Sequence, residues 1–185
     1  MMRFEPHAYG ETVAKILALD GAGERLMPLA FPKCSSTEAR DAIARAGARG
    51  LFPQPRAPEA AQAGLYLYFS CWDEAHELAQ SIATADGSYW HAIVHRQEPD
   101  AGNSAYWFRR VGNHAIFPAL QAEAERIVHD RPGIAAVLPA RWDPFWFVDF
   151  CEKVRAGNAA DAIEAAREIQ RAEWQLLFQH CAARA

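Results

Sequence analysis

The stretch that decides the fold reads Ala156-Gly157-Asn158-Ala159-Ala160-Asp161-Ala162-Ile163-Glu164-Ala165. Gly157-Asn158 is typical of a tight turn, because both residues tolerate left-handed backbone and asparagine can cap the helix that follows. Alanines then recur on one face, where small side chains let two antiparallel helices approach closely. The stretch therefore predicts the second half of a helical hairpin, with Ala162 at the crossing and the last helix running to about residue 182.

Two more segments follow the same plan of a short turn and a helix with an early alanine on its inner face. They are Ser70-Cys71-Trp72-Asp73-Glu74-Ala75-His76-Glu77-Leu78-Ala79 and Ala101-Gly102-Asn103-Ser104-Ala105-Tyr106-Trp107-Phe108-Arg109-Arg110. Elsewhere apolar residues recur at spacings of three and four, and alternating β-branched runs are missing. The pattern predicts an all-α fold of about eight helices in antiparallel hairpins, with Ala105 buried at a crossing like Ala162.

Local signals place some of the helix ends. Ser35 followed by Glu38 reads as a capping box that opens a helix, and Asp86-Gly87 reads as a turn before a helix over 88–97. The 185 residues suffice for one helical domain over 1–185. We divide it into N-terminal helices with a proline-rich linker (1–57), repeat-like hairpins (58–130) and a C-terminal hairpin (131–185).

Asp73-Glu74-Ala75 and Asn158-Ala159-Ala160-Asp161-Ala162 resemble the second-helix signature of tetratricopeptide and Sel1-like repeats. The resemblance covers roughly two-thirds of the chain and implies an irregular right-handed array of hairpins. The spacing departs from that family, because Ala75 and Ala105 are 30 residues apart where the repeat has about 34. The segments 89–96 and 106–112, with Tyr106-Trp107-Phe108-Arg109-Arg110, also resemble an uncharacterised family of bacterial helical proteins, which implies no activity.

Composition excludes several classes of protein. The net charge of −4 gives no basic excess for nucleic acid. The N-terminus lacks the apolar run of a signal peptide, and no stretch has the roughly 18 apolar residues of a membrane span. We therefore expect a cytoplasmic protein. Its four widely spaced cysteines form no Cys-x-x-Cys pair, and we expect them to be small buried hydrophobic residues.

The densest set of unusual side chains lies between residues 72 and 114. On a helix over 88–97, His91, His95 and Glu98 fall along one stripe, and two histidines four residues apart suit a zinc or iron ion. His76, Glu77 or Asp73 on the preceding helix could add a ligand. The alternative is a pair of helix histidines packed on aromatic rings and bonded to carboxylates. His91-x-x-x-His95 lacks the metalloprotease glutamate.

Aromatic and basic residues continue this region on the next helix. Tyr106 and Trp107 offer aromatic surface, and Arg110, one turn beyond Trp107, could stack on its ring or bind an anion. The alternative is an arginine paired with Asp100 or Glu98. The sequence contains no phosphate-binding loop and no nucleophile elbow.

Two functions remain open. The first is a binding or scaffold module without catalysis or cofactor, which holds a protein, a peptide or a small anionic ligand. Its expected ligand-binding residues are His76, His91, His95, Glu98, Tyr106, Trp107 and Arg110. The second is a metal-dependent or small-molecule enzyme that uses the cluster of His91, His95 and Arg110, with His91 and His95 on the metal. We also leave open a homodimer that buries the end of the last helix.

Overall fold

The computed structural model describes residues 4–30 and 33–183, and within them every regular element is a helix. Ten α-helices and two short 3-10 helices replace the expected eight or so. They are η1 (Pro6–Tyr9), α1 (Glu11–Ala18), η2 (Gly21–Gly23), α2 (Thr37–Leu51), α3 (Pro58–Tyr68), α4 (Trp72–Ser81), α5 (Ala85–Gln97), α6 (Ala101–Val111), α7 (Phe117–Val128), α8 (Pro132–Ala135), α9 (Pro144–Ala156) and α10 (Ala160–Ala182). The all-α prediction is confirmed.

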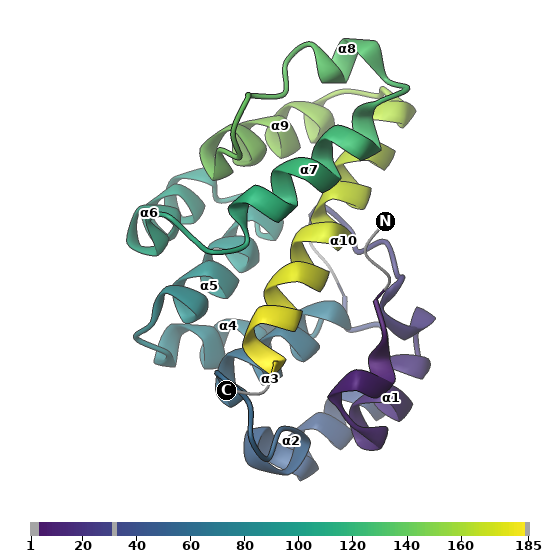
Figure 1. Ribbon diagram of the computed structural model, residues 1–185, viewed down its shortest axis with the longest axis vertical. Helices are drawn as coiled ribbons and strands as arrows, with labels where there is room; N and C mark the ends of the chain where they lie inside the picture. Colours follow the sequence, from purple (N-terminus) through teal and green to yellow (C-terminus); the bar gives the residue numbers. More distant parts are fainter. Residues whose placement is uncertain (1–3, 31–32, 184–185) are drawn as a thin grey trace.

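Consecutive helices pack as neighbours from α2 to α6, as hairpins do. The last helix breaks this order, because α10 crosses the molecule and lies against α3, α7 and α9 (Figure 1). In an open array of repeats each unit contacts only its neighbours. The return of α10 to α3 instead closes the chain around one cluster of buried apolar residues, which extends from Phe4 to Ala182.

Two predicted helix ends are displaced. Ser36, not Ser35, caps α2 by accepting a hydrogen bond from the backbone N–H of Ala39 at 3.1 Å. Ser35 instead donates to Asp20 Oδ2 at 2.7 Å. Asp86 and Gly87 lie inside α5, because Thr84 caps that helix through the Gly87 N–H at 3.2 Å. A side chain at Gly87 would meet the carbonyl oxygen of Ile82 at 2.4 Å, so the close turn before α5 requires glycine.

The predicted crossings at Ala105 and Ala162 are wrong, since both residues are only half-buried. The close approach occurs at Gly64, where an added Cβ would lie 2.7 Å from the ring of Trp90. Trp174 of α10 donates its indole N–H to the Gly64 carbonyl at 2.7 Å. One glycine therefore brings α3, α5 and α10 together at the centre of the fold.

A buried ion pair links α5 to α10. Arg96 and Glu173 are both fully buried, and the Arg96 guanidinium binds both carboxylate oxygens of Glu173. Tyr89 donates to Glu173 Oε1 at 3.1 Å, Gln170 accepts from Arg96 Nη2 at 3.4 Å, and Phe147 lies under the guanidinium with its ring centre 4.4 Å away. The charges are therefore paired and hydrogen-bonded where water does not reach them.

Removing one member of this pair should be costly. Glu173→Ala leaves the Arg96 charge buried and unpaired, and we expect the free energy of unfolding to fall by about 3–5 kcal/mol. Glu168→Ala, on the same helix, breaks the partly exposed pair with Arg131 and should cost about 1 kcal/mol or less. Urea denaturation of the two variants measures both values. Equal losses would contradict the central role of the buried pair.

Candidate functional site

Two helices bring three histidines together. His76 lies on α4, and His91 and His95 lie one turn apart on α5. The Nε2 atoms of His91 and His95 are 3.1 Å apart, and the His76 ring stands perpendicular to both, with centroids 4.6 Å from His91 and 5.2 Å from His95. One nitrogen of each ring lies within 4.8 Å of the others. We call these three residues the histidine cluster.

Glu98 fixes the orientation of His95. Its Oε2 lies 2.9 Å from His95 Nδ1, and a carboxylate accepts a proton there, so Nδ1 carries the hydrogen of the neutral ring. The lone pair of His95 is then on Nε2, which faces His91. A carboxylate that holds the far nitrogen of a histidine in this way is the usual outer partner of a metal-bound imidazole.

Two tryptophans enclose the histidine cluster. Trp72 stacks on His76 with ring centroids 4.9 Å apart, and Trp107 stacks on His91 at 4.0 Å. The Trp72 indole donates to the Val94 carbonyl of α5 at 3.3 Å, which holds α4 against α5. Only 2% of His91 and 7% of His95 are exposed, whereas His76 is half-buried. Solvent therefore reaches the cluster from the side of His76.

Burial suppresses protonation of His91 and His76. Burial, and then the neighbouring His95 and His76, lower the pKa of His91 to about 4. Burial, followed by the nearby His95, also lowers the pKa of His76. His91 therefore remains neutral at pH 7, with Nδ1 buried and without a hydrogen-bond partner among the described residues.

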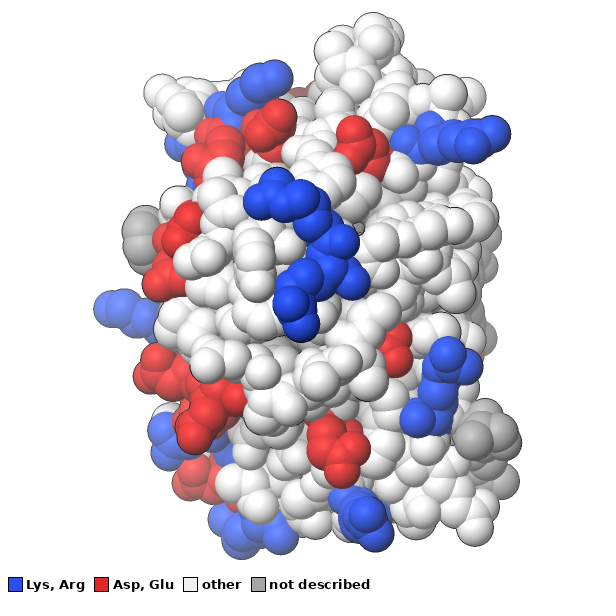
Figure 2. Space-filling model, turned by 90° about the vertical axis from the view of Figure 1, so that its left-hand side faces the viewer, with Lys and Arg blue, Asp and Glu red and all other residues white. Residues whose placement is uncertain are grey.

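The remaining predicted site residues lie at the edge of the cluster. Arg110 places its guanidinium 5.2 Å from the centre of the Trp107 ring, the stacked alternative raised by the sequence. Tyr106 contacts Trp107 edge to face at 5.4 Å but is 47% exposed. The side of the molecule on which α6 lies carries lysine and arginine side chains near its middle (Figure 2). The basic residues of α6 are Arg109 and Arg110, and both are exposed.

A second cluster went unnoticed in the sequence. Asp86 Oδ1 lies 3.0 Å from His114 Nε2 and 3.2 Å from His180 Nε2. The Ile116 backbone N–H donates to His114 Nδ1 at 3.4 Å, so Nε2 carries the ring hydrogen and donates it to Asp86. His114 then has no lone pair left for an ion. We therefore interpret this cluster as a clasp joining α5, the loop before α7 and the end of α10.

The prediction that the cysteines are simply buried hydrophobic residues is wrong for two of the four. Cys34 and Cys71 form a disulfide across 37 residues, whereas Cys151 and Cys181 are free and buried, as expected. Neither the spacing nor a motif indicated this pairing. The disulfide lies in the wall of a cavity of about 590 Å³, which Trp72 and Glu98 also line.

The chain matches no protein-family model, no curated protein and no solved structure. The resemblance to tetratricopeptide and Sel1-like hairpins therefore stays a prediction. None of the described helices is both long and apolar enough to cross a lipid bilayer.

The clasp should make stability depend on pH. Burial alone would raise the pKa of Asp86, but the hydrogen bond from His114 and the nearby His180 outweigh it and hold the pKa below its usual value. A carboxyl group whose pKa is lower in the folded protein stabilises the fold at pH values above its pKa in the unfolded chain, which is about 4. This stabilisation is lost as the pH falls through the pKa of the folded state. Asp86→Asn should therefore cost about 1–3 kcal/mol at pH 7 and progressively less below pH 4.

Denaturation of wild type and variant between pH 3 and pH 7 measures this difference. Asp130→Asn, at a carboxylate whose side chain is 98% exposed, is the matched control and should show no such pH dependence. A constant loss for Asp86→Asn at every pH would mean that the carboxylate charge does not stabilise the clasp.

Proposed function

We propose that the protein binds a transition-metal ion at the histidine cluster, with His76, His91 and His95 as ligands. The observation that carries the proposal is the convergence of three ring nitrogens from two helices within 4.8 Å. A tetrahedral site with metal–nitrogen bonds of about 2.0–2.1 Å separates its ligand atoms by about 3.3 Å. The 3.1 Å between the His91 and His95 nitrogens is close to that value.

A hydrogen-bonded chain is the competing account of the same residues. Glu98, His95 and His91 can share hydrogens in a line without any ion, but this chain gives no role to His76, whose ring stands edge-on to both imidazoles. Burying the His91 and His95 rings side by side is unfavourable unless something pairs with their lone pairs. A cation supplies that partner, and Glu98 already presents His95 in the tautomer that an ion requires.

The donor set selects the kind of ion. Imidazole nitrogens suit zinc, copper, nickel or iron, whereas magnesium and calcium prefer oxygen ligands. Three protein ligands leave a fourth position for water or another small ligand, as in catalytic zinc sites. The solvent-facing side at His76 allows such a ligand to reach the ion.

This proposal refines both functions raised by the sequence. The module that binds a peptide or a small anionic ligand would use the fourth position for the ligand, and the metal-dependent enzyme would use it for a reactive water. The cavity of about 590 Å³ is bordered by Glu98 and Trp72 rather than by Tyr106 or Arg110. A small ligand on the ion therefore accords better with the geometry than a peptide laid over α6.

Zinc titration of untagged protein against a chromogenic chelator tests the proposal. We expect about one ion per chain, an affinity at least ~100-fold weaker in His91→Ala or His76→Ala, and a ~10–100-fold loss in Glu98→Gln. Zinc at 100 times its dissociation constant should stabilise the wild type by about 2.7 kcal/mol and leave His91→Ala unaffected.

His180→Ala is the matched control, because His180 belongs to the clasp and should keep the wild-type zinc affinity. Copper quenching of Trp72 and Trp107 fluorescence offers a second measurement, since these rings stack on two of the ligands. The proposal fails if the folded wild type takes up neither zinc, copper, nickel nor cobalt at micromolar concentrations. It also fails if His180→Ala loses as much affinity as His91→Ala.

A further inference from the structure

The cavity beside the disulfide has the features of a binding site. Its wall contains both bonded cysteines, two basic residues and three acidic ones; the lining residues are Lys33, Cys34, Arg40, Ser70, Cys71, Trp72, Asp73, Glu74, Gln97 and Glu98. Lys33 can attract a carboxylate, as can Arg40, which also pairs with Asp41 and Glu74, and Asp73 and Glu98 can attract an ammonium group. A zwitterionic molecule therefore matches the charges of the cavity better than an ion of one sign.

Gln97 provides an independent sign of a ligand. It is fully buried in the wall of this cavity, and neither its amide oxygen nor its amide nitrogen has a hydrogen-bond partner among the described residues. Buried amide groups are almost always paired, because an unpaired one costs about 1–3 kcal/mol. A molecule that offers both an N–H and a carbonyl group, as a peptide bond does, would satisfy both atoms once the amide turns toward the cavity.

The two sulfur atoms differ in access. Cys34 is half-buried, whereas Cys71 is 1% exposed, so a molecule in the cavity reaches Cys34 first. Cys71 is the N-cap residue of the ten-residue helix α4. The free N–H groups and the positive end of a helix stabilise a thiolate at that position. Attack on the more accessible Cys34 therefore makes Cys71 the leaving group.

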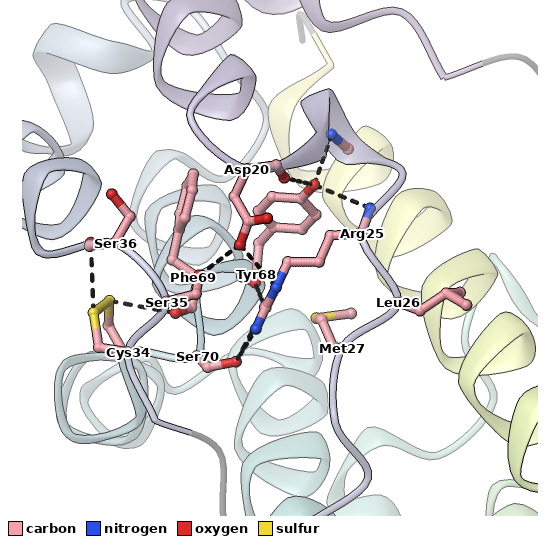
Figure 3. A network of polar contacts seen from close by, with 12 residues as sticks. Asp20, Arg25, Leu26, Met27, Cys34, Ser35, Ser36, Tyr68, Phe69 and Ser70 are labelled. Atoms are coloured by element: carbon pink, nitrogen blue, oxygen red, sulfur yellow. Dashed lines mark hydrogen bonds and ion pairs between the residues drawn. A yellow bond between two sulfur atoms is a disulfide. The ribbon is translucent and has the colours of Figure 1, made fainter.

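The backbone on both sides of the disulfide is held without it (Figure 3). The Ser35 N–H donates to the Phe69 carbonyl at 2.7 Å. Arg25 donates to Ser70 Oγ at 3.1 Å and so holds a residue with a left-handed φ of +56° directly before Cys71. The Cys34 sulfur lies 3.5 Å from the Ser36 carbonyl, which can accept the thiol hydrogen once the bond is opened. Opening the bond therefore leaves the two sulfurs close enough to reform it.

From these observations we infer that Cys34–Cys71 is a thiol-exchange site for a small zwitterionic peptide thiol that binds in the cavity. The thiolate of the bound molecule attacks Cys34 Sγ, a new sulfur–sulfur bond forms to Cys34, and the electron pair of the broken bond leaves on Cys71. The reverse attack by the Cys71 thiolate restores the disulfide and releases the small thiol. The inference requires no metal ion.

Glutathione is a suitable probe, because it carries both charges and two peptide bonds. Folded Cys71→Ser protein is incubated with oxidised glutathione, quenched by acid and mapped by peptide mass spectrometry. We expect a stable adduct on Cys34, since no partner thiol can displace it. Cys34→Ser should give no adduct on the buried Cys71. Cys151, whose pKa burial raises to about 11, should stay unmodified and serve as an internal control. An adduct on Cys71 as rapid as that on Cys34 would overturn the inference.

A kinetic measurement on the unaltered disulfide keeps the test valid if a cysteine variant does not fold. The rate at which reduced glutathione opens the bond is divided by the rate for neutral 2-mercaptoethanol, in folded and in urea-unfolded protein. We expect this ratio to be at least ~10-fold higher in the folded protein. Arg40→Gln should lower it, whereas Arg45→Gln, an exposed arginine of α2 outside the cavity wall, should not. A ratio that folding leaves unchanged would show that the cavity does not bind the thiol.

Discussion

The ion pair between Arg96 and Glu173 is the constraint on which the rest of the structure depends. It joins α5 to α10 where neither charge is exposed. The hydrogen-bond partners of the two charged groups must compensate for the hydration that these groups lose on folding. Tyr89 and Gln170 add hydrogen bonds to the pair, and Gln170 also binds the carbonyls of Met27 and Pro28. A single network therefore fixes α5, α10 and the segment after α1 relative to one another.

The same pair determines which way the histidines face. At about 100° per residue, Tyr89 and Arg96 project roughly 140–160° away from His91 on α5. Measured from His95 the separation is about 100–120°, so the side chains of α5 that reach α10 point well away from those that face α4. All residues from Gly87 to Gln97 are buried. A rotation of α5 about its axis would therefore break the polar contacts on both of these sides of the helix. The ion pair between Arg96 and Glu173 thus helps to hold the imidazoles of His91 and His95 in the orientation that faces α4.

Local spacing in the sequence predicted what a single helix determines. The stripe of His91, His95 and Glu98 and the stacking of Arg110 on Trp107 both join residues three or four apart, and the geometry of a helix fixes such pairs. His76 could be named as an additional ligand only because α4 directly precedes α5. The spacing of apolar residues by three and four likewise predicted the all-α fold.

The contacts that were missed join residues far apart in the chain. Arg96 meets Glu173 across 77 residues, Cys34 bonds Cys71 across 37, and Asp86 receives His114 and His180 from two other elements. No periodic signal reports such pairs, because they depend on how helices pack rather than on how each one forms. The shift of the α2 cap from Ser35 to Ser36 has the same origin, since Asp20 and the Phe69 carbonyl engage Ser35 from outside its own segment.

The start of α4 connects the two proposed sites. Cys71 precedes the helix, Trp72 begins it and stacks on His76, and Glu98 borders the cavity while it holds His95. A molecule whose ammonium group pairs with Glu98 would compete with His95 for that carboxylate. The binding of such a molecule and of an ion would then be coupled, and by thermodynamic linkage the ion would change the affinity for the molecule by the same factor. Glu98 contacts His95 and borders the cavity directly, so this coupling requires no movement of the remaining helices.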